Sequence, residues 1–349
     1  MTDTMKFGYL EAHHNTKIAE RAIPEVKEDE VLVRQLACNI CTTEYQQWLG
    51  LREHQGYPIC SGHEGAGIVE KVGRNVKGLS VGDLVAVGYD SCGECEMCQE
   101  GRYTECLYPT PRDKKTDDGF LGQFGFATHC VRKGRMLHKM NPELDPAEAG
   151  FLEPVATVCK GMKKLRLEPS ETVVVIGAGT MGLLNAKVAK AKGARVIVSE
   201  LLDKKLEAAK NAGFETVNGA VCDPAEEVMK LTDGRGADCV IAAVASTGAN
   251  KQAADMLKKN DGRILLFAAG YPAPEIPFDS NLIHYRRIEI IGTYDADAQE
   301  FNEAARLLNT RQVEVLDLVE PKRYKLDDLD AAFAAAAAPG MFRVCVEMK

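Results

Sequence analysis

Six residues that follow a short apolar run constrain the fold of this chain more than any other feature. The apolar run is Val173–Ile176, and the residues after it are Gly177, Ala178, Gly179, Thr180, Met181 and Gly182. In a strand–turn–helix unit, the first glycine of this pattern permits a tight turn and the second lets a pyrophosphate approach the backbone. The third lets the helix pack on the strand. Free N–H groups at the helix start, near Thr180 and Met181, would bind the phosphates. The pattern therefore predicts a dinucleotide-binding βαβ unit.

An acidic residue at the end of the next predicted strand indicates which dinucleotide binds. Glu200 stands eighteen residues after Gly182. A carboxylate there can accept hydrogen bonds from the adenosine ribose hydroxyls, and it would repel a 2′-phosphate. We therefore expect NAD rather than NADP.

Strands and helices alternate over residues 156–293, which predicts an α/β domain with a doubly wound parallel sheet. The wholly apolar strand at its start fits a parallel sheet that is covered on both faces. A helix follows the glycines to about residue 192. Further strands are expected at 194–199, 237–243 and 263–268, and further helices at 155–167, 203–211 and 250–259.

The rest of the chain has a different character. Residues 1–155 contain β-rich runs punctuated by Gly and Asp, which predicts an irregular β-barrel with helical insertions. Residues 294–349 are assigned to the same domain. Helices are expected there at 297–308 and 331–338, and a last strand at 343–347.

Four of the twelve cysteines fall within fifteen residues, with the spacing C-x2-C-x2-C-x7-C. Thiolates on so tight a loop can converge on one tetrahedral cation, and four of them leave no open coordination position. The spacing predicts a closed, structural Zn²⁺ site. Its ligands would be Cys92, Cys95, Cys98 and Cys106.

Composition excludes several classes of protein. At 349 residues we expect two domains, and 45% hydrophobic with 27% charged residues is ordinary for a globular protein. The formal net charge is −8 and basic runs are absent, so neither nucleic acid nor an anionic membrane is an expected partner.

Three other features of the sequence indicate a cytoplasmic protein. The first residues contain no basic segment followed by an apolar run, so we expect no signal peptide. No run is long enough for a transmembrane helix. In a reducing compartment the remaining cysteines should pack as buried thiols; these are Cys38, Cys60, Cys130, Cys159, Cys222, Cys239 and Cys345.

Several motifs in order give the chain a family resemblance that covers essentially its whole length. Cys41 follows a β-rich run, His63-Glu64 stands in a Gly-His-Glu-x-x-Gly-x-Val run, and Glu153-Pro154 precedes the dinucleotide domain. With the four-cysteine lobe, the Val81-Gly-Asp turn and the glycine pattern, these motifs resemble the zinc-dependent medium-chain alcohol dehydrogenase family. Within it, the chain is most similar to the sorbitol (polyol) and threonine dehydrogenase branch. The resemblance implies a GroES-like β-barrel catalytic domain (1–155 and 294–349) beside an NAD-binding Rossmann domain (156–293).

The resemblance also implies a second, catalytic zinc. Cys41 and His63 would hold it, with Glu64 and Glu153 as the nearby carboxylates, and the sequence leaves open which of the two binds the metal. This zinc keeps an open position for water or substrate. It would lower the pKa of a bound alcohol while the dinucleotide accepts a hydride. We therefore expect two zinc ions per chain.

Two further residues take roles from the family pattern. Thr43 stands where the family has a Ser or Thr hydroxyl beside the reacting oxygen, and we assign it the first step of a proton relay. Lys205 stands where relatives often carry an Arg near the adenine.

The chain departs from the family pattern on the substrate side. Gln46 replaces a common His, and Gln cannot accept and release a proton as imidazole does. The relay must then run through water, the cofactor ribose or another residue, with His54 as a candidate if its loop folds inward. The run after Cys41 is altered to Thr-Thr-Glu44, and the small-acidic-aromatic run of the barrel reads Ala-Thr-His at 127–129. Trp48 and Tyr57 could line the pocket or simply pack.

The leading hypothesis is a zinc- and NAD-dependent dehydrogenase that acts on a secondary alcohol, either a polyol, a sugar or a sugar-derived substrate. A threonine-type amino-alcohol dehydrogenase is the alternative within the class. A zinc-ribbon module would need a basic face, and a metal-free reductase would lack Cys41 and His63, so both are disfavoured. Family habit implies a homodimer or homotetramer, and the apolar segment Arg287–Tyr294 could pair across a sheet edge.

Overall fold

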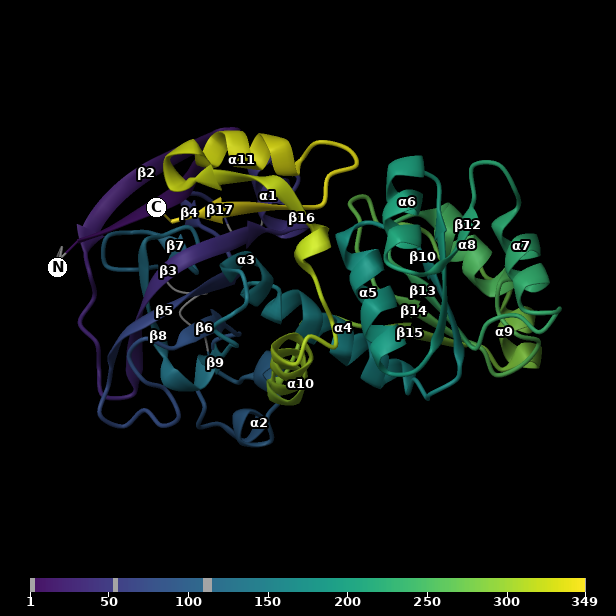
Figure 1. Ribbon diagram of the computed structural model, residues 1–349, viewed down its shortest axis with the longest axis horizontal. Helices are drawn as coiled ribbons and strands as arrows, with labels where there is room; N and C mark the ends of the chain where they lie inside the picture. The colour runs from purple at the N-terminus through teal and green to yellow at the C-terminus, as the bar shows by residue number, and fades with distance from the viewer. Residues whose placement is uncertain (1–3, 53–55, 109–114, 349) are drawn as a thin grey trace. The chain divides into compact units, whose positions relative to one another are not determined.

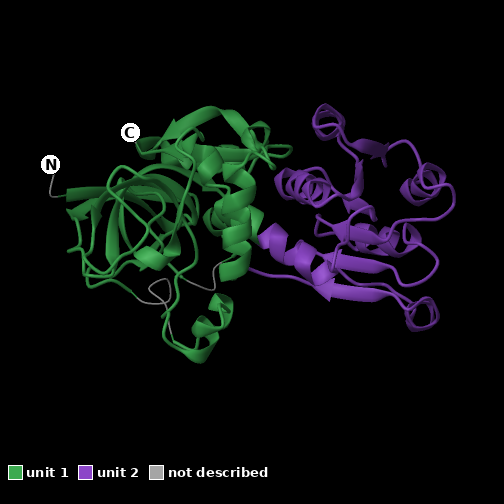
Figure 2. Ribbon diagram, turned by 60° about the horizontal axis from the view of Figure 1, so that its bottom comes forward, with its two compact units in different colours: residues 1–156, 296–349 green, residues 157–295 purple. Residues whose placement is uncertain are grey.

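The computed structural model describes residues 4–52, 56–108 and 115–348. The chain divides into two compact units (Figure 2). Unit 1 comprises residues 1–156 and 296–349, and unit 2 comprises residues 157–295. The boundary falls inside helix α4 (Leu152–Leu165). Among the described residues, no helix combines the length and the hydropathy that a membrane span requires.

Unit 2 is built on a six-stranded sheet in which every neighbouring pair of strands is parallel (Figure 1). Its strand order is β12-β11-β10-β13-β14-β15, so the sequence of strands reverses between β10 and β13. Nucleotides bind at such a reversal in doubly wound sheets. The strands are β10 (Thr172–Ile176), β11 (Arg195–Glu200), β12 (Glu215–Asn218), β13 (Cys239–Ala242), β14 (Arg263–Leu266) and β15 (Glu289–Gly292).

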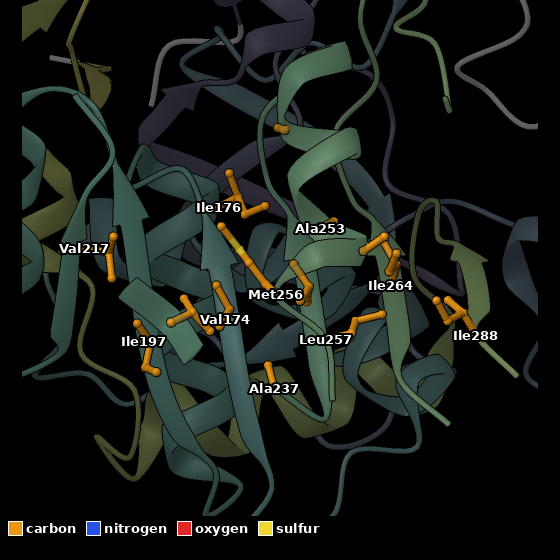
Figure 3. Packing of buried hydrophobic residues seen from close by; sticks show 14 residues of the cluster. Val174, Ile176, Ile197, Val217, Ala237, Ala253, Met256, Leu257, Ile264 and Ile288 are labelled. Atoms are coloured by element: carbon orange, nitrogen blue, oxygen red, sulfur yellow. The ribbon is translucent and has the colours of Figure 1, made fainter. Parts of the chain in front are cut away.

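Helices connect these strands and cover the sheet. They are α5 (Thr180–Ala191), α6 (Asp203–Asn211), α7 (Pro224–Leu231), α8 (Thr247–Asp255) and α9 (Ser280–Arg286). One side of the sheet contributes Val174, Ile197 and Ile264 to a buried cluster that also includes Ala253 and Met256 (Figure 3). Burial on both faces explains why the central strands are apolar at every position rather than alternating.

Unit 1 contains two sheets. The smaller has the order β2-β1-β4-β7, and the larger has the order β16-β17-β3-β5-β6-β9, with β8 paired to β3. The long strand β3 pairs with β5, β8 and β17, so it is the centre of this unit. The strands are β1 (Thr4–Ala12), β2 (Asn15–Ala22), β3 (Glu30–Ile40), β4 (Ile59–Cys60), β5 (Glu64–Val72), β6 (Leu84–Val87), β7 (Leu121–Gly122), β8 (His129–Lys133), β9 (Leu137–Lys139), β16 (Val319–Lys325) and β17 (Arg343–Glu347).

Short helices complete unit 1. The α-helices are α1 (Thr42–Trp48), α2 (Glu96–Gln99), α3 (Pro146–Ala149), α10 (Ala298–Asn309) and α11 (Leu329–Ala336). The alanine-rich α11 packs on β17 through Ala332 and Phe333, both fully buried. Trp48 joins the same cluster, and its indole N–H donates to Asp330 at 2.9 Å. Trp48 therefore has a packing role.

The predicted combination of a β-rich domain and a doubly wound parallel-sheet α/β domain is confirmed. Boundaries differ at several elements: the helix expected at 155–167 is α4 (152–165), and the one expected at 250–259 is α8 (247–255). The strand segment 287–294 contributes only β15, residues 289–292. One expectation is wrong: Cys222 is exposed, whereas the other six scattered cysteines are buried. It lies in the turn after β12, where its apolar neighbour Val221 is also 80% exposed.

Candidate active site and metal centres

Strand pairing brings the first two predicted zinc ligands together. Cys41 follows the end of β3 and begins α1, and His63 immediately precedes β5. The antiparallel register of these strands pairs Asn39 with Glu64. The end of β3 therefore lies beside the start of β5, and this places Cys41, two residues after Asn39, close to His63, one residue before Glu64.

Glu44 links these two residues. Its carboxylate accepts the Cys41 backbone N–H at 2.9 Å and the Gly62 backbone N–H at 3.3 Å, and it forms a short hydrogen bond with His63 Nδ1. Burial disfavours the charged imidazole, but the Glu44 carboxylate beside it outweighs burial and raises the pKa of His63 well above its ordinary value. The bond to Nδ1 leaves Nε2 as the nitrogen that can face a metal.

Arg343, the first residue of β17, binds Glu64. Its guanidinium donates to both oxygens of Glu64, at 2.6 and 2.9 Å, and its Nη2 lies 3.5 Å from the Cys41 sulfur. The Glu64 side chain is fully buried and that of Arg343 is 6% exposed. Desolvation raises the pKa of Glu64, and the facing guanidinium opposes the shift. The Glu64 charge is therefore matched by a buried cation.

Glu153 reaches the same region from the first turn of α4. Gly150 precedes this helix, and a Cβ at Gly150 would lie 2.6 Å from the Glu64 carbonyl oxygen. Only glycine allows so close an approach of the chain to β5. Glu153 is 6% exposed, and its carboxylate accepts a hydrogen bond from the Tyr89 hydroxyl. Tyr89 is in turn packed edge-on against Phe301 of α10, with centroids 5.2 Å apart.

The donor atoms form two overlapping groups that share His63. In one, the donors of Cys41, Glu44 and His63 lie within 4.8 Å of one another, and in the other those of His63, Glu64 and Glu153 do. A thiolate, an imidazole and a carboxylate are donors that suit Zn²⁺. His63 thus links the four residues expected near the catalytic zinc, with Cys41 in one group and Glu64 and Glu153 in the other, and the structure adds Glu44 and Arg343.

Thr43 lies in the first turn of α1, and its hydroxyl accepts a hydrogen bond from Arg52 Nη1 at 2.9 Å. Gln46 is on the same helix. Tyr57 donates its hydroxyl to the Gln47 carbonyl at 2.6 Å, which fixes the chain after α1. His54, the alternative relay residue, lies outside the described residues.

The four-cysteine lobe has the arrangement that its spacing predicts. The sulfurs of Cys92, Cys95, Cys98 and Cys106 all lie within 4.8 Å of one another. A hydrogen bond from the Leu107 backbone lowers the pKa of Cys95 to about 6, whereas burial, then the neighbouring thiols, raises the pKa of Cys98 to about 12. Without a cation, these opposite shifts favour the thiolate at Cys95 and the neutral thiol at Cys98. Coordination to Zn²⁺ would stabilise the thiolate form of both.

The glycine loop of unit 2 has the backbone geometry that its spacing predicts. Gly177 has φ +99°, and a Cβ at Gly182 would overlap the Gly177 carbonyl. Thr180 begins α5 and Met181 follows it, so their N–H groups lie in its first turn. The N-terminus of a helix in a dinucleotide-binding unit is a place where an anion can bind.

Glu200 lies at the end of β11 and is fixed by backbone donors. One of its oxygens accepts Ala178 N–H at 2.7 Å, and the other accepts Leu201 N–H at 2.7 Å and Leu202 N–H at 3.1 Å. Lys205 Nζ lies 3.5 Å from the position of a Cβ on Gly179. Both predicted residues therefore border the glycine loop.

Comparison with known proteins decides the family. Residues 27–142 match the sequence model of the alcohol dehydrogenase GroES-like domain, and residues 180–310 match that of the zinc-binding dehydrogenases. A 2-dehydro-3-deoxy-L-galactonate 5-dehydrogenase of Pseudoalteromonas atlantica is 30% identical over 84% of each chain. The chain belongs to the zinc-dependent medium-chain alcohol dehydrogenase family. A sorbitol dehydrogenase of Halalkalibacterium halodurans is 29% identical over 91% of each chain.

Solved structures agree on the fold. A protein of Sinorhizobium meliloti, described as a zinc-binding dehydrogenase and solved with NADP bound, has a TM-score of 0.87 at 26% identity over 99% of both chains. A benzyl alcohol dehydrogenase of Acinetobacter calcoaceticus also gives 0.87, at 24% identity over 99% of both chains. The predicted family, its alcohol and polyol dehydrogenase activity, and its cofactors, zinc and a nicotinamide dinucleotide, are thereby confirmed.

Sequence reasoning missed four residues of the site. Glu44 was noted only as a departure from the family pattern, although a carboxylate three residues after a helix start is a capping signal. Arg52, Tyr89 and Arg343 carry no local signal. Arg343 is 302 residues from Cys41, and only the pairing of β17 with β3 brings them together.

Proposed function

We propose that the chain is an NAD-dependent zinc dehydrogenase that interconverts a secondary alcohol of a polyol, sugar or sugar-derived substrate with the corresponding ketone. The observation that carries the proposal is the cluster of donor atoms around His63 in unit 1 of a family member, with Cys41 on one side of His63 and Glu153 on the other. The curated relatives support the substrate class, because one is named for a neutral polyol and one for a sugar acid. Unit 1 would carry the catalytic residues and unit 2 the dinucleotide.

Glu153 is the carboxylate that we assign to the zinc, together with Cys41 and His63. Glu64 is held at both oxygens by Arg343, so its charge is already compensated. A carboxylate that is bound twice to a guanidinium in the interior has little to gain by leaving it. Glu64 would then orient Arg343 beside the Cys41 sulfur.

When bound, zinc supplies a Lewis acid that makes the alcohol more acidic, and the dinucleotide supplies a hydride acceptor. The chain's own residues do the rest. Glu44 keeps the His63 ring in one orientation through Nδ1. The Thr43 hydroxyl takes the proton from the reacting oxygen and passes it on. Because Gln46 does not titrate, that proton continues to water or to a ribose hydroxyl rather than to an imidazole.

We infer a preference for NAD over NADP from Glu200. Its carboxylate is held in place by three backbone N–H groups. Oε1 accepts two of them and Oε2 accepts one, so Oε2 keeps a lone pair that can accept a ribose hydroxyl. A 2′-phosphate would meet this fixed negative charge. Lys205, beside Gly179, is the cation that would approach the cofactor.

A panel of polyols assayed with NAD and with NADP, by absorbance of the reduced cofactor, tests the activity and the preference. We expect turnover that is lost on removal of zinc, and kcat/KM at least tenfold higher with NAD. Turnover in fully metal-free protein, or a preference for NADP, would contradict the proposal. Oxidation of L-threonine in place of polyols would favour the threonine-type alternative.

Metal analysis tests the ligand assignment. We expect two zinc ions per chain in the wild type and in Glu64→Gln, and one in Glu153→Gln. Glu300→Gln is a matched control, because Glu300 is a buried carboxylate that caps α10 outside both donor groups. If Glu64→Gln loses zinc and Glu153→Gln keeps it, the two carboxylates have the opposite roles.

We also propose a homodimer or homotetramer that forms through β15. This strand is an end of the six-stranded sheet, and Tyr285 and Tyr294 near it are 74% and 72% exposed. An exposed edge strand with aromatic neighbours can pair with a second copy. Light scattering of wild type and Ile290→Lys tests this, and a wild-type monomer would overturn it. The cytoplasmic location stays a prediction.

A further inference from the structure

Arg52 is a cation that lies beside the candidate reaction centre and that the proposed mechanism leaves without a role. Its Nη1 donates to the Thr43 hydroxyl oxygen at 2.9 Å. The hydroxyl has two lone pairs and one hydrogen. Arg52 uses one lone pair, so the other can still accept the reacting hydroxyl and the hydrogen can still be donated. The contact orients Thr43 without preventing a relay.

The rest of the guanidinium is not used by the protein. Arg52 Nε is buried and has no hydrogen-bond partner among the described residues, and no carboxylate of these residues forms an ion pair with Arg52. Three other arginines of unit 1 do form ion pairs: Arg21 with Asp118, Arg34 with Glu70 and Arg343 with Glu64. A partly buried guanidinium that pairs with no carboxylate is a site for an oxyanion, which would meet its Nη groups because Nε is enclosed by the protein.

We propose that Arg52 binds an anionic group of the substrate, so that the substrate is a polyhydroxy alcohol carrying a carboxylate or a phosphate. This inference rests on the proposed function. Two hydrogen bonds in series, from the reacting oxygen to Thr43 and from Thr43 to Arg52, span at most about 6 Å. An acid group about two or three carbons from the reacting carbon can therefore reach the guanidinium. Arg52 would select the substrate and would place its reacting carbinol beside Thr43.

The test compares matched substrates that differ in charge. Neutral alditols are assayed against the corresponding aldonates and the corresponding alditol phosphates, with wild type, Arg52→Met, Arg52→Lys and the surface control Arg74→Met. Wild type is expected to prefer one anionic series at least tenfold in kcat/KM, which identifies carboxylate or phosphate. In Arg52→Met this preference should fall at least tenfold, mainly through KM, so that neutral and anionic substrates become nearly equivalent. Arg52→Lys should keep part of it, and Arg74→Met should match wild type.

Anion binding to Arg52 can also be measured without turnover. Malonate and inorganic phosphate are titrated into zinc-loaded wild type and Arg52→Met, and thermal unfolding is followed. At least one of these anions should raise the melting temperature of wild type, with its apparent Kd weakened at least tenfold in the variant. Equal anion binding by wild type and variant, or a wild type that prefers neutral alditols, would overturn the role of Arg52.

The outcomes separate the two proposals. Equal losses for neutral and anionic substrates in Arg52→Met would mean that Arg52 only orients Thr43, and the inference would be wrong while the dehydrogenase proposal stands. If no alcohol of any charge is oxidised, the proposed function fails, and the anion titration alone decides whether Arg52 is an anion site.

Discussion

Replacing Arg343 with methionine would leave the Glu64 carboxylate without its partner in the interior of unit 1. The two side chains are 6% and 0% exposed, and two hydrogen bonds of 2.6 and 2.9 Å join them. Water cannot replace the guanidinium at such a site without disrupting the packing around it. The cost is therefore that of an uncompensated buried charge rather than that of one lost hydrogen bond.

The expected loss is about 3–5 kcal/mol, the range for breaking one partner of a buried pair. Unit 1 contains roughly two hundred residues. For a domain of that size, about 1 kcal/mol shifts the melting temperature by roughly 2–4 °C. Arg343→Met should therefore lower the melting temperature of unit 1 by about 6–20 °C. A second substitution, Glu64→Gln, removes the stranded charge and should restore at least half of the loss.

The chain offers a matched control in Arg287, which binds Asp261 through two hydrogen bonds of 2.7 Å each. The geometry is similar, but the side chains are 59% and 60% exposed. Arg287→Met should leave the melting temperature almost unchanged, because solvent screens an exposed ion pair. Thermal unfolding of the zinc-loaded proteins by circular dichroism is the measurement. If Arg343→Met shifts the transition no more than Arg287→Met does, or if Glu64→Gln adds to the loss, then burial does not make the unpaired Glu64 charge destabilising.

Three further predictions follow from the same unit. Cys98→Ser should reduce bound zinc from two ions to one by metal analysis, and retention of both would show that the lobe is not a metal site. Tyr89→Phe removes the hydrogen bond that the Tyr89 hydroxyl donates to Glu153 but keeps the aromatic ring packed on Phe301. Zinc should be retained while kcat/KM falls about tenfold, and unchanged kinetics would show that this hydrogen bond does not contribute to activity. Burial lowers the pKa of His138 to about 4 from 6.5, so the folded state resists protonation and stability is lost as pH falls from 6.5 to 4. His138→Phe should abolish this loss, on the order of 3 kcal/mol, in urea unfolding across that range, and an unchanged pH profile would contradict it.

Local patterns in the sequence were sufficient for some of these features. The four cysteines lie within one loop, so their spacing alone indicates that their sulfurs can meet. The glycine loop is equally local, because its turn and its close helix contact are made by residues within a stretch of six. The expectation for Cys222 failed because an apolar neighbour in sequence does not reveal whether a turn is covered.

The sequence by itself determined where the four-cysteine lobe and the glycine loop would form, since short-range backbone geometry and residue type fix them. Only the tertiary structure decided the electrostatics of the active site. Arg343 binds Glu64 from a strand near the end of the chain, and Tyr89 binds Glu153 across 64 positions. Such contacts depend on strand pairing and packing between distant segments, and no period or spacing along the chain encodes which charges they bring together.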